Sequence, residues 1–299
     1  MVLTQKESQD TGLISYLAGQ VISEKIVSLT KKVSFSAFVY DVNKHLIVKF
    51  PKNEALVSDW RRTAVITPIL RTKLPVPIPC PLVSTAQTPD HRTIPVALYE
   101  KIQGEVLQPY HFKYKSEAFK IRVFEQLSDV VATLHRIEAT TLPVSVPDTL
   151  DYGVDRIFYE LGIKHAPKDL CKRMVHRLYY GKGNPGAHSL CHADLHTRNL
   201  CLSGSKLVGV LDFDSLSRGD AALEFRPYLY ARHDLARLRH IYQQRHGITL
   251  DKRHLHVLAH IKNVITPALV TRYAVRNLCQ VRPGHLIRQI SSFILQNNR

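Results

Sequence analysis

The stretch CHADLHTRNL, residues 191–200, places two histidines, an acid, an arginine and an amide between apolar ends. Its acid, Asp194, and its amide, Asn199, lie five positions apart, and a second polar group follows in LDFD, residues 211–214. Phosphoryl transfer needs a carboxylate that accepts the proton of the attacking hydroxyl, oxygen ligands for Mg²⁺, and a cation that holds the nucleotide phosphates. The residue types in these two segments therefore favour phosphoryl transfer as the first hypothesis.

Each residue has a role in that chemistry. Asp194 is the candidate base, and because Mg²⁺ prefers hard oxygen donors, Asn199 and Asp212 are the candidate metal ligands. Lys49, in the apolar run LIVKF, is the candidate cation for the phosphates. Taken singly, an aspartate in a loop is usually a turn residue or cap, and a lysine in a strand usually keeps an edge soluble. The combination, with its spacing, is what indicates catalysis.

The pattern resembles the aminoglycoside phosphotransferase and choline kinase superfamily, in which H-G-D-x-x-x-x-N is followed by [IL]-D-[FW]. Further segments resemble family motifs in the same order: VKFPK (48–52), LPVPIP (74–79), YEKIQGEVL (99–107), LHRI (134–137) and RGDAALEF (218–225). The resemblance covers residues 33–225, and the lysine strand and proline connector are nearest to the 2″-type aminoglycoside enzymes.

The resemblance implies an α+β, bilobal, protein-kinase-like fold. It predicts a small β-rich N-terminal lobe, residues 1–103, that binds nucleotide, and a larger, mainly helical lobe, residues 104–299, that carries catalysis and substrate binding. Two lobes of unlike composition commonly bind a ligand between them.

The resemblance also assigns roles residue by residue. His192 would support the catalytic loop, Asp194 would be the base, Asn199 and Asp212 would bind Mg²⁺, and Lys49 would contact the α- and β-phosphates. The implied cofactors are ATP, with GTP as the alternative nucleotide, and Mg²⁺. The remaining nucleotide contacts would come from a phosphate-covering loop and from the backbone between the lobes: Ser34, Phe35 and Ser36, then Tyr99, Glu100, Lys101 and Ile102.

Four departures from the family pattern stand out. Ala193 replaces the glycine before the catalytic aspartate, and the loop KVSFSAF (32–38) has no glycine. The acid that normally pairs with the strand lysine should fall near Thr63, which cannot form that pair; Asp59 or Glu54 are the substitutes the sequence offers. The last departure replaces the Pro and Asp of G-D-P-x-x-D with Ala221 and Glu224.

Periodicity and turn residues predict the other elements. Pro68 is expected to kink or end the second predicted helix. The predicted elements are a helix at 12–28, a hairpin of strands 33–40 and 45–50, a helix at 54–71, an extended connector at 73–81, a strand at 94–102, helices at 114–139 and onward to about 180, a loop at 181–186, strands at 189–191 and 206–212, and helices beyond 220.

Composition limits the class of protein. The content of 44% hydrophobic and 22% charged residues is that of a globular protein, and no apolar run is long enough to span a membrane. Five scattered cysteines argue against a disulfide framework and for a cytoplasmic location. The net charge is +16, and residues 221–299 hold thirteen Lys and Arg against three Asp and Glu, a surplus of +10.

These observations predict a small-molecule kinase that transfers the γ-phosphate of ATP to a hydroxyl of a sugar, antibiotic or metabolite. In the family the acceptor lies against the helices after the metal loop, so the basic surplus there disfavours a polycationic aminoglycoside. A weakly active pseudokinase or nucleotide-binding module is the alternative, supported by Thr63 and the glycine-free loop. No membrane partner is expected. Nucleic acid is a minor alternative, because no recognition motif accompanies the charge. Asp214 is either a supporting acid or a surface residue.

Overall fold

The computed structural model describes residues 1–32, 34, 36–151, 169, 172–173, 176, 189–228 and 232–248. It divides into two compact units: the first holds Met1–Thr133, Thr140–Ser145 and Asp194–Leu216, and the second holds the remaining segments. Phe35, the helix predicted to reach residue 180, the loop at 181–186 and the chain beyond 248 lie outside the described residues.

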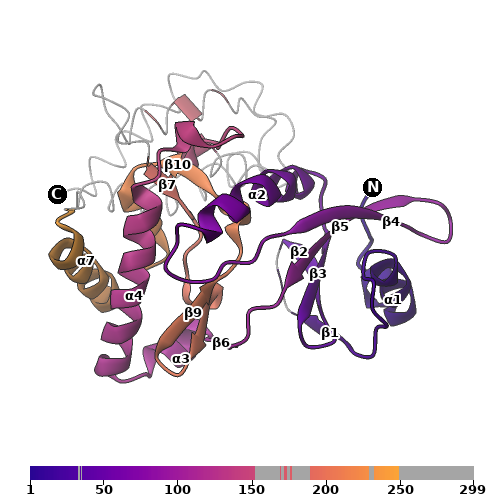
Figure 1. Ribbon diagram of the computed structural model, residues 1–299, viewed down its shortest axis with the longest axis horizontal. Helices are drawn as coiled ribbons and strands as arrows, with labels where there is room; N and C mark the ends of the chain where they lie inside the picture. The colour runs from indigo at the N-terminus through magenta and orange to yellow at the C-terminus, as the bar shows by residue number, and fades with distance from the viewer. Residues whose placement is uncertain are drawn as a thin grey trace, which may run out of the picture. The chain divides into compact units, whose positions relative to one another are not determined.

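A five-stranded antiparallel sheet forms the centre of the first unit (Figure 1). The strand order is β1-β2-β3-β5-β4. Both predicted strands of the hairpin and the later strand are present, whereas β1 and β4 were not predicted. The strands are β1 (Leu29–Lys32), β2 (Ala37–Val42), β3 (Leu46–Pro51), β4 (Leu82–Gln87) and β5 (Thr93–Glu100).

The turn between β2 and β3 explains why the predicted hairpin forms. Asn43 and Lys44 have φ angles of 52° and 65°, the left-handed pair that a tight hairpin turn requires. The turn fixes a register in which Lys49 lies opposite Val39 on one side and Ala97 on the other. Lys49 is therefore flanked by strands on both sides and is no edge-strand residue.

The two faces of this sheet pack against different helices. One face packs Phe38, Val48 and Ile94 against α1 (Thr11–Gly19), and the other packs Ala37 and Tyr99 against α2 (Ala55–Arg71). Because side chains alternate along a strand, Lys49 lies on the α2 face, between Val48 and Phe50 of the opposite face. Alternation alone thus directs the lysine toward α2.

The helix predicted at 12–28 is too long, because α1 ends at Gly19. Asp10 caps its start by accepting a hydrogen bond from the Leu13 N–H at 3.0 Å. Beyond the helix, the Gln20 side chain donates to the Gln87 carbonyl and accepts from the Gln87 N–H, each at 2.7 Å. Contacts with β4, which lies 67 residues further along the chain, therefore take this segment out of the helix.

Helix α2 agrees with its predicted bounds but does not end at Pro68. It continues to Arg71, so the proline lies in the last turn and, having no N–H, cannot donate the usual hydrogen bond to the carbonyl four residues earlier. Next to it, the Thr67 hydroxyl donates to the Thr63 carbonyl at 2.8 Å.

The remaining described elements follow the predicted order with additions. The predicted long helix is α4 (Glu117–His135), and the predicted strands are β7 (Ser189–Cys191) and β9 (Lys206–Val210). Strands β6, β8 and β10 were not predicted; β6-β8-β9 form one sheet and β10-β7 another. The additional elements are η1 (Glu7–Gln9), β6 (Glu105–Val106), α3 (Pro109–Lys113), η2 (Ala139–Thr141), η3 (Thr197–Asn199), β8 (Leu200–Ser203), η4 (Phe213–Ser215), β10 (Ser217–Gly219), η5 (Ala221–Tyr228) and α7 (Arg232–His246).

Two further expectations can be compared with the described residues. Cys80, Cys191 and Cys201 are free thiols, as the scattered cysteines predicted. Within the described part of the chain, no helix has the length and apolar character needed to span a membrane.

Candidate active site

The structure brings Lys49 together with both acids of the LDFD segment. Its Nζ lies 2.8 Å from Asp212 Oδ1 and 3.2 Å from Asp214 Oδ2, although 163 and 165 residues separate them in sequence. The same ammonium lies 4.8 Å from the centre of the Tyr99 ring, a cation–π distance. The Lys49 ammonium, the Tyr99 ring and the carboxylates of Asp212 and Asp214 thus form one charged cluster on the α2 face of the sheet.

The pKa values in this cluster reflect burial and charge together. Burial by itself lowers the pKa of Lys49, but the carboxylates of Asp212 and Asp214 outweigh it and hold that pKa well above its usual value. Burial raises the pKa of Asp214 to about 7, and the nearby Asp212 carboxylate also raises it while Lys49 opposes the shift. Lys49 therefore stays charged.

Helix α2 fastens the loop that carries the two acids. The Trp60 indole donates to Asp214 Oδ2 at 3.0 Å, Arg62 lies 3.5 Å from the Asp214 carbonyl, and the Thr63 hydroxyl lies 3.5 Å from the Phe213 carbonyl. Trp60 is fully buried, so its indole has a fixed position. Three residues of α2 therefore contact two consecutive residues of the loop, Phe213 and Asp214.

The two acids proposed as substitutes for the missing helix acid do not reach Lys49. Asp59 pairs with Arg62 at 2.7 Å, and Glu54 pairs with the amino group of Met1 at 3.4 Å while its side chain is 79% exposed. That part of the sequence prediction is wrong. The helix positions before Thr63 contribute the indole of Trp60 instead of a carboxylate.

Asp194 and Asn199 are joined within their own loop. The Asn199 Nδ2 donates to the Asp194 carbonyl at 2.8 Å, and the Leu211 N–H donates to the Asn199 carbonyl at 2.8 Å. This second bond places Asn199 beside the start of the segment that leads into Asp212. The Asp194 carboxylate also lies 3.8 Å from Nε2 of His196, a histidine with no predicted role.

The donor set in this region fits a divalent cation such as Mg²⁺. The hydrogen bond from Nδ2 turns the Asn199 amide so that its oxygen remains for a metal, and Asp212 supplies a carboxylate that is 35% exposed. Asp212 has a φ angle of 62°, a left-handed conformation that aspartate tolerates better than most residues. Two hard oxygen donors next to a lysine match what a nucleotide-bound Mg²⁺ requires.

In the second unit, Glu224 supports the backbone just before Asp194. Its carboxylate accepts from the N–H groups of His192 at 2.6 Å and Ala193 at 3.2 Å. Two successive N–H groups that converge on an anion form a nest, which fixes the local backbone. His192 is fully buried, in keeping with a supporting role, and Glu224 retains the acid function of the family pattern.

Ala193 occupies a backbone conformation that favours glycine. Its φ angle is 63°, and a residue with a Cβ pays about 1–2 kcal/mol to adopt it. We expect Ala193→Gly to stabilise the protein by up to about 1 kcal/mol, since glycine's greater freedom in the unfolded chain offsets part of the gain. Thermal unfolding measures this.

A matched control comes from the fully buried Ala132 of α4. Ala132→Gly lies in a helix interior and should destabilise by about 1 kcal/mol. If Ala193→Gly lowers the unfolding temperature as Ala132→Gly does, the left-handed conformation at position 193 does not strain the native protein.

The predicted phosphate-covering loop is the turn between β1 and β2. Lys32 and Val39 form the last pair of these strands, so Ser34 and Ser36 lie in the turn. The Lys52 ammonium donates to the Ser34 carbonyl at 2.7 Å, which adds a second lysine that the sequence did not single out. Phe35, the third predicted residue, lies outside the described residues.

The segment predicted to meet the purine leaves β5 at Glu100. Its Lys101 N–H is already used, since it donates to the His45 carbonyl at 2.8 Å. The side chains of Glu100, Lys101 and Ile102 line a cavity of about 330 Å³ shared with the connector that contains Pro77. Tyr99 is buried, and its ring contacts Lys49. The sequence predicted a nucleotide contact for the Tyr99 backbone but did not predict the contact between its ring and Lys49.

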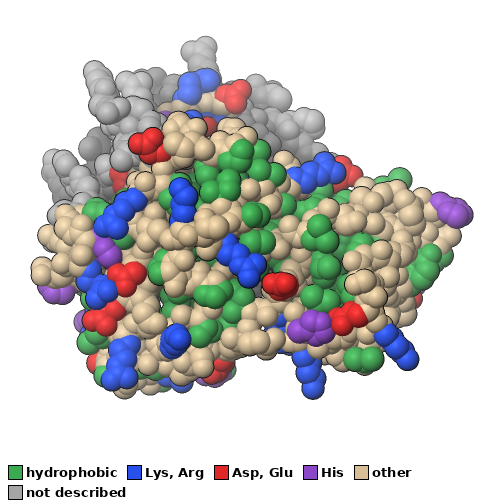
Figure 2. Space-filling view, in the orientation of Figure 1, with side chains coloured by type: hydrophobic (Ala, Val, Ile, Leu, Met, Phe, Trp, Pro, Cys, Tyr) green, Lys and Arg blue, Asp and Glu red, His purple; other side chains and the backbone are tan. Residues whose placement is uncertain are grey.

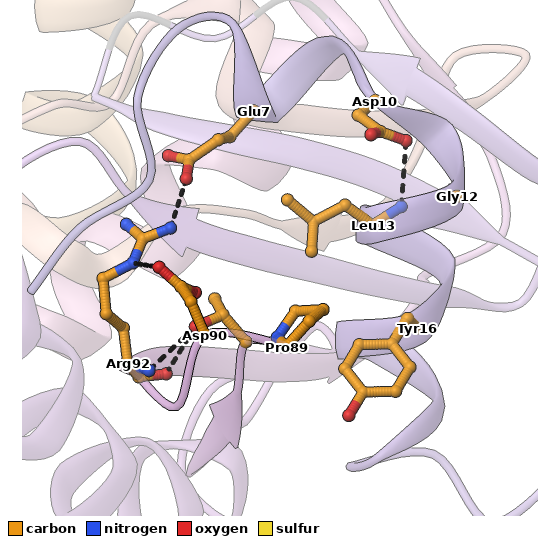
Figure 3. A pocket seen from close by; sticks show the side chains of 9 residues that line it. Glu7, Asp10, Gly12, Leu13, Tyr16, Pro89, Asp90 and Arg92 are labelled. Carbon is orange, nitrogen blue, oxygen red and sulfur yellow. Dashed lines mark hydrogen bonds and ion pairs between the residues drawn. The ribbon is translucent and has the colours of Figure 1, made fainter.

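A further cavity, of about 450 Å³, lies at α1 and the turn between β4 and β5 (Figure 3). Arg92 bridges Glu7 and Asp90 there, and its hydrogen bond lowers the pKa of Glu7 to about 2. This cavity borders α1, which packs on the sheet face opposite Lys49. The ion pairs of Arg92 connect the segment before α1 with the turn between β4 and β5. None of the predicted site residues lines this cavity.

Similar folds occur among solved phosphotransferase structures. The GDP complex of wild-type aminoglycoside 2'-phosphotransferase-IIIa has a TM-score of 0.65 at 18% identity, covering 96% of this chain and 98% of that chain. The streptomycin-ATP-APH(2")-IIa ternary complex has a TM-score of 0.56 at 18% identity, covering 99% and 97%. Macrolide 2'-phosphotransferase MphH from Brachybacterium faecium has a TM-score of 0.60 at 15% identity, covering 91% and 100%.

At these identities the likeness shows the fold, and it confirms the predicted α+β, protein-kinase-like class. No curated protein sequence matches this chain. The family model described as the phosphotransferase enzyme family, APH, matches residues 25–256, which include every residue of the site described above. The chain belongs to the phosphotransferase enzyme family.

Proposed function

We propose that this protein is an ATP-dependent kinase that transfers the γ-phosphate to a hydroxyl of a small molecule. The observation that carries the proposal is the cluster of Lys49 with Asp212 and Asp214, next to a loop in which Asn199 bonds to Asp194. Family membership supports the reaction class, and the intact set of base, metal ligands and phosphate-binding lysine supports activity.

In the proposed mechanism Asp194 accepts the proton of the acceptor hydroxyl as the hydroxyl oxygen attacks the γ-phosphorus. The bond between the γ-phosphorus and the β–γ bridging oxygen breaks, and ADP leaves with the bonding electron pair. Asn199 and Asp212 would hold Mg²⁺, which when bound neutralises charge on the nucleotide phosphates. Lys49 contacts the α- and β-phosphates. Glu224, through the backbone of His192 and Ala193, keeps the catalytic loop in one conformation, which matters because misplacement of a base by about 1 Å can cost a hundredfold in rate.

The acceptor is proposed to be neutral or anionic. Residues 221–299 carry a surplus of +10, and eight of their thirteen basic residues lie beyond residue 248, outside the described residues. On the face drawn in Figure 2, acidic and basic side chains of the described residues are interspersed. A cationic substrate region would repel a polycationic aminoglycoside and slow its encounter with the enzyme.

The solved structures of this fold do not select the acceptor, since they include a kanamycin complex and macrolide phosphotransferases. Charge is therefore the property of this chain that discriminates among hydroxyl compounds. A sugar, a sugar acid, a macrolide-like compound or a phosphorylated metabolite fits it better than kanamycin does.

The test measures release of ADP or GDP with ATP or GTP, Mg²⁺ and a panel of neutral, anionic and polycationic hydroxyl compounds. We expect turnover with a neutral or anionic acceptor at a kcat/KM at least about tenfold above that with kanamycin or gentamicin, a difference of about 1.4 kcal/mol. The Asp194→Asn variant supplies the background. Efficient kanamycin-dependent turnover would overturn the charge argument.

The alternative, a nucleotide-binding module without catalysis, has its own signature in the same assay. Nucleotide and Mg²⁺ would raise the thermal unfolding temperature, yet neither acceptor-dependent nor slow intrinsic hydrolysis would exceed the Asp194→Asn background. The carboxylates at Lys49 argue against this alternative, because they compensate for the absence of an acid at Thr63.

A further inference from the structure

The lysine of this site has an unusual source of carboxylate contacts. The family pattern places the lysine's acidic partner on the helix near Thr63, and threonine cannot fill that role. Asp59, the acid within α2, instead pairs with Arg62. Among the described residues, the carboxylates that contact Lys49 come from the loop after β9, through Asp212 and Asp214.

The two acids are not equivalent. The Asp212 side chain is 35% exposed and is the proposed metal ligand, so a bound Mg²⁺ would compete with Lys49 for it. The Asp214 side chain is 9% exposed, and the oxygen that contacts Lys49 is the same Oδ2 that accepts the Trp60 indole hydrogen bond. Asp214 can therefore remain with Lys49 when Asp212 serves the metal.

Two residues of helix α2, Trp60 and Thr63, contact the loop that carries Asp214. Trp60 precedes Thr63 by three positions, so the two side chains share a helix face. Trp60 reaches the Asp214 carboxylate, and Thr63 lies at the Phe213 carbonyl of the same loop. A larger side chain at position 63 would have to displace that loop, because Thr63 is 1% exposed.

We propose that Asp214 is the positioning residue for Lys49: it replaces the missing helix acid, and the Trp60 indole fixes its carboxylate. In this arrangement the helix supplies a hydrogen-bond donor, the Trp60 indole, and the loop supplies the carboxylate that pairs with Lys49. This inference rests on the proposed function, since it names how the same site holds its lysine toward the nucleotide.

The experiment measures the affinity of a non-hydrolysable ATP analogue, and of the GTP analogue in parallel, at saturating Mg²⁺. Asp214→Asn keeps the shape but removes the charge, and should weaken binding roughly tenfold. Trp60→Phe removes the indole donor together with part of the buried ring, and should weaken binding by roughly threefold. Glu54→Gln, at an exposed acid that does not contact Lys49, is the matched control and should bind as wild type.

Tryptophan fluorescence separates a local change at Asp214 from general damage to the fold. Trp60 is the only tryptophan of the 299 residues, so its fluorescence reports directly on the Asp214 contact and should change in Asp214→Asn but not in Glu54→Gln. The same spectrum checks that Asp214→Asn and Glu54→Gln are folded, and thermal unfolding checks Trp60→Phe, which has no tryptophan.

Two results would overturn the inference. One is wild-type affinity in Asp214→Asn at saturating Mg²⁺; the other is an Asp214→Asn variant whose nucleotide affinity no longer depends on Mg²⁺, which would make Asp214 a metal ligand. Failure of the proposed function looks different: the wild-type protein would transfer no phosphate to any acceptor, while the binding differences among the variants would still be measurable.

Discussion

The Asp194→Asn variant is expected to lose turnover by about a thousandfold while its nucleotide affinity stays within about twofold of wild type. A positioned general base contributes typically about 10²–10⁴ in rate, and an amide cannot accept the hydroxyl proton. The side chain is nearly isosteric, and the contact that orients Asn199 uses the backbone carbonyl of Asp194, which the substitution preserves. Steady-state kinetics with the identified acceptor and nucleotide titration measure the two quantities.

The control for this variant is Asp90→Asn, which changes the charge of the protein by the same amount. Asp90 pairs with Arg92 beside α1, on the opposite face of the sheet from Lys49, and the Asp90 side chain is 62% exposed. It should retain full turnover. Wild-type turnover in Asp194→Asn would remove Asp194 from the role of base, and equal losses in both variants would indicate an effect of net charge.

The residues that the sequence could identify are those whose spacing is local. Asp194 and Asn199 belong to one loop, and five positions are enough to define their relation. Lys49 and Asp212 could be connected only through resemblance, because 163 residues separate them and no periodicity links a strand to a distant loop. Their contact is a property of the folded chain.

The roles of Trp60 and Asp214 show what local pattern could not supply. The sequence shows that the helix acid is missing, and the predicted substitutes, Asp59 and Glu54, lie in or next to the same helix. The substitute came from a loop 154 residues away from Trp60. The sequence does show a tryptophan, Trp60, one helical turn before Thr63. The role of its indole donor could not be predicted, because the acceptor, Asp214, lies 154 residues away.

The same reasoning explains the errors in secondary structure. The apolar pattern after Gly19 continues with helical spacing, yet the segment leaves the helix because Gln20 bonds to the backbone of Gln87. Tertiary hydrogen bonds of this kind override weak intrinsic preferences. The hairpin at Asn43 and Lys44, by contrast, was predictable because its turn is encoded by adjacent residues.

The Asp212→Asn variant is expected to lose the dependence of nucleotide affinity on Mg²⁺, with turnover reduced by about a hundredfold or more, because metal ions supply several kcal/mol of transition-state stabilisation. An amide oxygen is a weaker ligand than a carboxylate, since it carries no formal charge. The native fold should persist, because Lys49 keeps Asp214 as its partner. Titrations of nucleotide with Mg²⁺ and with EDTA measure the effect.

This pattern distinguishes Asp212 from the two other acids of the site. Asp194→Asn should retain Mg²⁺-dependent binding and lose turnover, whereas Asp214→Asn should weaken binding even when Mg²⁺ is saturating. Asp212→Asn should bind nucleotide equally with and without Mg²⁺, because the variant has lost a ligand of the metal. If Asp212→Asn retains the wild-type response to Mg²⁺, then Asp212 serves Lys49 alone, and the metal ligands of this site must be sought among other residues.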